Sequence, residues 1–215
     1  MTFSIVATDP NTGEVGCAVA SKYLAIGAVT PWVRAGVGAV ATQAMGVVAG
    51  NGERVLAALV AGTDPAAAID HTLAADTGSE LRQLGVLSAD GVTAAYTGSR
   101  CVEWAGHLTA TGFAVQGNML AGESVLAAMR DAFLNTNAAL PERMMTVIEA
   151  GQAAGGDHRG QQAAALVIER VGAAEWSREG VDRICDLRVD DHPEAVAELR
   201  RLVTLWRQRQ LERYS

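Results

Sequence analysis

The 215-residue chain has the length of one domain, and 49% of its residues are hydrophobic, enough apolar surface for one buried core. The formal net charge of -7 at neutral pH argues against nucleic-acid binding, because that affinity depends on clustered basic side chains. The N-terminus lacks the basic segment of a signal peptide, and no apolar run approaches the roughly 18 residues of a membrane span. We therefore expect a single cytoplasmic domain over residues 1–215, with neither a membrane nor a nucleic acid as partner.

Apolar periodicity predicts the elements along the chain. Alternation predicts a hairpin at the N-terminus, closed by a turn at Asp9–Gly13. The expected strands are 2–7, 14–21, 36–43, 81–88, 92–97, 113–117, 163–168 and 183–189. The expected helices are 53–61, 65–75, 124–135, 141–153 and 194–213. This order predicts two sheets, each covered by helices on its outer face.

Local signals refine two boundaries. Asp64 before Pro65 is typical of a helix N-cap with proline in the first turn. The segment Ala89-Asp90-Gly91 favours a type I′ hairpin turn, which requires positive φ at both central residues.

The cysteines and the acidic cluster near the C-terminus are poor metal candidates. Cys17, Cys101 and Cys185 form an odd set without a CxxC pair, so we expect buried, reduced side chains. Asp190-Asp191-His192 resembles a metal-ligand set, but alternation separates the two aspartates, and capping of the helix that follows Pro193 explains the same residues. We expect no metal and no cofactor.

Thr2 is the candidate nucleophile. A threonine hydroxyl needs an adjacent base, and the free α-amino group of an N-terminal threonine, with a pKa of about 8, supplies one. We expect removal of Met1, because the side chain that follows it is small. A retained Met1 would turn this amine into an amide and remove the base. The alternative interpretation is that Thr2 merely begins a strand.

Three further residues are candidates for support of this chemistry. Lys22 is the single lysine of the chain and falls at the open end of the hairpin, where its ammonium would lower the pKa of the Thr2 amine and stabilise negative charge. Gly117 and Asn118 end a strand, and a backbone N–H with a side-chain amide would form an oxyanion hole. The alternatives are an ordinary surface lysine and a turn-forming Gly-Asn pair.

We expect substrate contacts from Ser21, Gln43, Asp157 and Arg159. The last two lie in the glycine-rich segment 155–160, where their charges bind either a polar substrate or each other. The segment lacks the GxxxxGK pattern of a phosphate-binding loop, so we do not expect a nucleotide site.

The chain resembles the domain of unknown function 1028 family, within the N-terminal nucleophile (Ntn) hydrolase superfamily. The matching blocks are 2–7, 18–22, 35–44, 104–107, 115–118, 155–160 and 189–193. The resemblance implies an α+β fold, a four-layer αββα sandwich with the nucleophile at the start of a central strand. It also implies cleavage of amide bonds through an acyl intermediate on the N-terminal residue.

The sequence departs from the family pattern at two places. Met45-Gly46-Val47-Val48 replaces an aromatic residue and an Asn-Pro stretch, and Ala163 replaces a commoner serine. If the first segment lines the pocket, we expect a smaller or more apolar substrate.

Three functions therefore compete. The first is an Ntn-type hydrolase acting on a small amide, peptide or acylated amine. The second is a catalytically inactive small-molecule-binding or regulatory protein that keeps the fold. The third is a metal-dependent hydrolase built on Asp157, Asp190, Asp191 and His192. The amphipathic C-terminal helix also leads us to expect a homo-oligomer, most simply a dimer.

Overall fold

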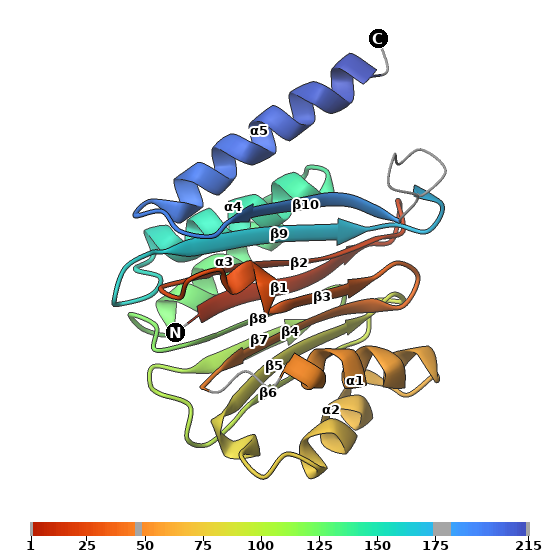
Figure 1. Ribbon diagram of the computed structural model, residues 1–215, viewed down its shortest axis with the longest axis vertical. Coiled ribbons are helices and arrows are strands. Elements are labelled where there is room, and N and C mark those ends of the chain that lie inside the picture. The colour runs from red at the N-terminus through yellow and green to blue at the C-terminus, as the bar shows by residue number, and fades with distance from the viewer. Residues whose placement is uncertain (1, 46–48, 174–181, 214–215) are drawn as a thin grey trace.

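The computed structural model describes residues 2–45, 49–173 and 182–213, which form a mixed α+β fold with two antiparallel sheets and five α-helices (Figure 1). The large sheet has the strand order β10-β9-β2-β1-β8-β7. Its strands are β1 (Thr2–Asp9), β2 (Glu14–Ser21), β7 (Gly106–Ala110), β8 (Phe113–Asn118), β9 (Ala163–Glu169) and β10 (Arg183–Val189). The small sheet has the order β3-β4-β5-β6. Its strands are β3 (Pro31–Arg34), β4 (Gly38–Ala44), β5 (Arg82–Ser88) and β6 (Thr93–Thr97).

The helices cover the two sheets separately. Helices α3 (Ser124–Asn135), α4 (Leu140–Ala153) and α5 (Ala195–Arg213) share one core cluster with the large sheet, to which β1 contributes Phe3 and Ile5. Helices α1 (Ala49–Val60) and α2 (Pro65–Ala74) pack on the small sheet. Figure 1 shows α1 and α2 in orange beside the small sheet, and α5 in blue along the opposite side of the molecule. Two short 3-10 helices lie in connections: η1 (Ile26–Ala28) between β2 and β3, and η2 (Ser79–Leu81) between α2 and β5.

Alternation along β1 divides its side chains between these environments. Phe3, Ile5 and Ala7 belong to the helix-facing core of the large sheet. Val6 instead packs in a cluster with Ala39, Ala41 and Leu87 of the opposite sheet. Because successive side chains on a strand point to opposite faces, Thr2 and Ser4 lie with Val6 on the inner face, toward the small sheet.

The N-terminal hairpin forms as the sequence predicts. Its register pairs Thr2 with Ser21 and Asp9 with Glu14. Gly13 takes the left-handed φ of 72° that the turn needs, and its N–H donates to the Asp9 carbonyl at 2.9 Å. The hairpin thus brings residue 2 and residue 21 side by side at its open end.

The prediction of a type I′ turn between β5 and β6 was wrong. Gly91 has a positive φ of 89°, but neither Ala89 nor Asp90 is among the described non-glycine residues with positive φ. The Gly91 N–H donates to the Ser88 carbonyl, and the Ser88 hydroxyl donates to the Asp90 carboxylate. A turn that contains one left-handed glycine therefore closes the loop between β5 and β6.

Other boundaries shift for local reasons. Strands β3 and β7 were not predicted, since both are short sheet-edge strands without an apolar run. Helix α1 begins at residue 49 rather than 53, because its first turn contains Gly50 and Gly52, which weaken the helical pattern. Asp64 caps α2 as predicted, accepting from the N–H groups of Ala66 and Ala67.

In the described part of the chain, no helix has both the length and the apolar composition that crossing a bilayer requires.

Candidate active site

Thr2 begins β1, a central strand of the large sheet, with β2 on one side and β8 on the other. The register places Ser21 opposite Thr2 on β2 and Asn118 opposite Thr2 on β8. The side-chain oxygens of Thr2 and Ser21 lie 3.1 Å apart, within hydrogen-bond distance. Residues that pair directly across strands share a face, so three polar side chains meet at this end of the inner face.

Asn118 makes a defined contact with the small sheet. Its Nδ2 donates to Oε1 of Gln83 at 2.9 Å, and both side chains are buried. Gly117, the other predicted oxyanion donor, lies inside β8 and pairs with Phe3 and Gly106. Its carbonyl accepts from Nε2 of Gln83 at 2.7 Å. The side-chain amide of Asn118 belongs to the residue directly opposite Thr2, and the oxyanion roles of Asn118 and Gly117 stay predictions.

A buried polar network continues from Asn118 between the sheets. Oε1 of Gln83 also accepts from Nε2 of Gln43 at 2.9 Å. Gln43 in turn accepts from the Ser4 hydroxyl at 2.7 Å, and Ser4 accepts from Nε2 of Gln116 at 2.6 Å. Nε2 of Gln43 also lies 3.4 Å from the carbonyl oxygen of Thr2. These contacts attach the first residues of β1 to the small sheet by hydrogen bonds rather than by apolar packing.

Lys22 follows Ser21 directly, and its ammonium binds a backbone carbonyl. Nζ donates to the Gln161 carbonyl at 3.0 Å, and the side chain is exposed. The ammonium of Lys22 thus binds the residue before Gln162, whose N–H donates to the Ser21 carbonyl at 3.0 Å. Its electrostatic role stays a prediction.

Asp157 and Arg159 interact with each other and with this same backbone. Oδ2 of Asp157 accepts from the Lys22 N–H at 2.8 Å, and Oδ1 accepts from the Arg159 N–H at 2.8 Å. The Arg159 guanidinium lies 3.2 Å from Oδ2. The carboxylate is buried and the guanidinium is partly exposed. Asp157 therefore anchors the segment that follows β2, and Arg159 offers the more accessible charge.

The backbone is strained next to two of these residues. Ala44 follows Gln43 with a φ of 81°, and Met119 follows Asn118 with a φ of 53°. The left-handed backbone conformation is unfavourable for residues with a Cβ. Backbone strain of this kind is concentrated at functional sites. Both strands therefore end abruptly beside the polar network. Residues 46–48, where the sequence departs from the family pattern, lie outside the described residues.

The acidic residues considered for a metal do not converge. Among residues 2–45, 49–173 and 182–213, no group of three His, Cys, Asp or Glu side chains is arranged to hold a metal ion. Asp190 pairs with Arg188 at 3.4 Å, and Asp191 accepts from Gln162 at 3.1 Å. Nδ1 of His192 accepts from the Glu194 N–H at 3.0 Å, next to the start of α5. The capping interpretation accounts for His192, and the metal-hydrolase alternative finds no geometric support in the described chain.

The cysteines are poor nucleophiles. All three are unpaired and buried, as expected. Burial raises the pKa of the Cys185 thiol to about 12, and it raises the pKa values of Cys17 and Cys101 as well. A thiol reacts as its thiolate, so these side chains are kept in the unreactive form.

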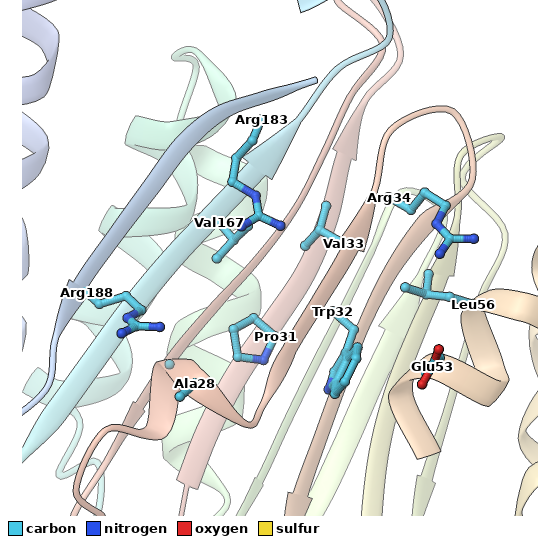
Figure 2. A pocket seen from close by; sticks show the side chains of 11 residues that line it. Ala28, Pro31, Trp32, Val33, Arg34, Glu53, Leu56, Val167, Arg183 and Arg188 are labelled. Carbon is cyan, nitrogen blue, oxygen red and sulfur yellow. The ribbon is translucent and has the colours of Figure 1, made fainter. Parts of the chain in front are cut away.

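Two pockets lie away from Thr2. The first, of about 440 Å³, lies between β3 and the edge of the large sheet (Figure 2). Figure 2 shows Arg183 and Arg188 on one side of it and Trp32 and Arg34 on the other. Arg183 is paired with Glu169 and Asp186, and Arg188 is paired with Asp190, so acidic partners offset much of the positive charge. The second pocket, of about 510 Å³, lies between the connection of β3 to β4 and the connection of α1 to α2. Neither is lined by a predicted site residue.

The centre of the polar network is not among the predicted site residues. The apolar pattern predicts Gln83 only as part of a strand, and Ser4 and Gln116 fall only within matching blocks. The available signal was a polar residue at an inward position of an otherwise apolar strand, since buried amides require partners.

Comparisons with known proteins identify the family of the chain and a similar fold. A sequence model described as a family of unknown function, DUF1028, matches residues 2–199. The crystal structure of protein SPO2555 from Silicibacter pomeroyi, which carries the same family description, is similar with a TM-score of 0.85 and 31% sequence identity. The similarity covers 94% of this chain and 88% of that one. No curated protein matches the chain.

Proposed function

Since the chain belongs to DUF1028, a family of unknown function, we propose its activity from the site itself: an amide hydrolase whose nucleophile is Thr2, freed by removal of Met1. The observation that carries the proposal is the position of Thr2. It starts a central strand, its hydroxyl oxygen is 3.1 Å from that of Ser21, and the buried Asn118 amide lies opposite. A hydroxyl, a potential free amine and a side-chain amide donor are thus gathered at one strand end.

The proposed reaction has two steps. The Thr2 α-amine accepts the hydroxyl proton as Oγ1 attacks the amide carbonyl carbon. The C–N bond then breaks, the proton passes to the departing amine, and an ester on Thr2 remains. Water hydrolyses this ester, which releases a carboxylic acid and restores the hydroxyl. Nδ2 of Asn118 supplies a hydrogen bond to the oxyanion that forms in each step.

The proposal extends to the architecture and to the supporting residues. The separate helical covers of the two sheets favour the four-layer αββα arrangement of Ntn hydrolases. Lys22 provides positive potential near the site, and Ser21 and Arg159 are the polar side chains that we assign to substrate binding. Gln43 and Asp157 contribute by holding the surrounding backbone.

A second candidate is an inactive small-molecule-binding protein that keeps the fold. One observation favours it: Thr2 is only 3% exposed. Turnover of a panel of N-acyl 4-nitroanilides distinguishes the two candidates. We expect hydrolysis by the protein that lacks Met1, none by Thr2→Ala, and partial activity in Thr2→Ser.

The matched control for the amine is a form with two residues added before Thr2. It keeps the hydroxyl but converts the amine to an amide, so it is expected to be inactive. Equal activity of this extended form and the processed form would contradict the role of the amine. Equal activity of Thr2→Ala would contradict the proposal as a whole.

We also propose a homodimer that involves α5. Leu205 is 43% exposed and Leu211 is 72% exposed on this helix. The molar mass by light scattering tests this, with Leu205→Glu/Leu211→Glu as the variant that should shift the protein to the monomer.

A further inference from the structure

Gln83 is the residue of the small sheet that contacts the Asn118 side chain. It lies on β5, where the register pairs it with Gln43 on β4 and Thr97 on β6. Its side chain is fully buried and reaches across to β8. Burial of such an amide costs free energy unless its oxygen and its nitrogen have partners.

The orientation of the Gln83 amide is determined by backbone carbonyls. Nε2 lies 2.7 Å from the Gly117 oxygen and 3.0 Å from the Gly106 oxygen. A carbonyl oxygen only accepts hydrogen bonds, so the nitrogen of Gln83 must face β7 and β8. The reversed amide would place its oxygen against two other oxygens.

This orientation determines that of Asn118. With Nε2 facing the carbonyls, Oε1 of Gln83 faces Nδ2 of Asn118 at 2.9 Å and Nε2 of Gln43 at 2.9 Å. An acceptor oxygen requires a donor, so Asn118 turns its nitrogen, not its oxygen, toward Gln83. That bond uses one of the two N–H groups on Nδ2. Asn118, which carries the second N–H group, pairs with Thr2 across the strands.

We infer that Gln83 is a positioning residue: it holds the Asn118 amide so that Nδ2 donates to the substrate oxyanion beside Thr2. The inference rests on the proposed function, because the oxyanion exists only if Thr2 attacks a carbonyl. The hydrogen bond from Asn118 to Gln83 also polarises Nδ2 of Asn118, since linked hydrogen bonds strengthen one another in a buried site. Gln83 itself touches no reacting atom.

The first test is NMR of the side-chain NH₂ group of Asn118. In the unmodified protein, the two protons should exchange with solvent at clearly different rates, with the one bound to Gln83 protected. In Gln83→Met, which removes the acceptor at nearly constant volume, this difference should be lost. Thr42→Val is the matched control, because Thr42 is buried on the same sheet and its hydroxyl has no partner among the described residues. Two equally exposed protons in the unmodified protein would overturn the inference without any variant.

The second test is acylation of Thr2 by a small aliphatic β-lactone, followed by intact mass. Gln83→Met should lower the maximal rate about 10- to 100-fold and leave the half-saturating concentration unchanged. Asn118→Ala should have a similar effect, and the double variant should be no slower than Asn118→Ala alone. Independent, multiplying effects would overturn the inference. If the unmodified protein is not acylated at all, the proposed function fails, and the NMR measurement still decides whether Gln83 orients Asn118.

Discussion

The hydroxyl oxygens of Thr2 and Ser21 lie 3.1 Å apart, on two strands whose register places these residues directly opposite each other. Both side chains are buried, so the contact restricts the rotation of each hydroxyl. The Thr2 oxygen is thereby held on the inner face of the large sheet, on the same side as Asn118. The side chain within hydrogen-bond distance of the Thr2 hydroxyl is thus that of its neighbour across the hairpin.

Ser21→Ala removes this hydroxyl contact. We expect acylation of Thr2 by the β-lactone to slow about fivefold, the rate equivalent of one neutral hydrogen bond of about 1 kcal/mol. The exposed Ser99 provides a matched control, and Ser99→Ala should react at the normal rate. An unchanged rate in Ser21→Ala would show that the contact does not orient the nucleophile.

Gly85→Ala tests whether the inter-sheet network tolerates a methyl group. A Cβ at this position would lie 2.0 Å from Oε1 of Gln116. Because both groups are buried, we expect a loss of about 1–3 kcal/mol in the free energy of unfolding. Urea denaturation measures the change. Gly122→Ala is the control, since its Cβ would meet nothing nearer than the Ser124 hydroxyl at 3.9 Å. Equal stability of the two variants would contradict the close fit around Gln116.

The Asp76–Arg82 pair predicts a defined acid sensitivity. Hydrogen bonds from the Arg82 guanidinium lower the pKa of the Asp76 carboxyl to about 2, with further support from the Gly78 N–H and Asn51. A carboxyl with a pKa lower in the folded than in the unfolded state stabilises the fold above its ordinary pKa. This stabilisation is lost as the pH falls from about 4 to about 2.

Asp76→Asn should therefore be less stable than the unmodified protein near neutral pH, by about 2 kcal/mol. The difference should shrink as the pH falls through that range. Urea denaturation across a pH series provides the measurement. A difference that stays constant down to the lowest pH would show that the carboxylate charge contributes nothing.

Because all three thiols are buried, we expect no labelling of cysteine in the folded protein. At mildly alkaline pH, a soluble aromatic disulfide should modify none of Cys17, Cys101 and Cys185 in the folded protein, and all three after denaturation. The reason is that burial raises each pKa and blocks access to the sulfur. Rapid labelling of one cysteine in the folded protein would reopen the possibility of a thiol nucleophile.

Features set by local periodicity could be predicted from the sequence. The hairpin of β1 and β2 follows from alternation and from the Asp9–Gly13 turn, and it places Thr2 beside residue 21. The inter-sheet network could not be predicted, because it depends on which faces meet. Gln83 and Asn118 are 35 residues apart in the chain and lie on different sheets. Nor does chain position determine where a long side chain goes: the ammonium of Lys22 binds a carbonyl 139 residues away.

The most direct test of the central claim is the intact mass of the protein from its native host, before and after the β-lactone, with Thr2→Ala in parallel. We predict a mass without Met1 and a single adduct that maps to Thr2 and is absent from Thr2→Ala. Thr8→Ala is the matched control, because Thr8 is another buried threonine of β1 whose hydroxyl donates to the Glu14 carbonyl, and it should form the adduct normally. Retained Met1, or an equal adduct on Thr2→Ala, would contradict the assignment of Thr2 as the nucleophile.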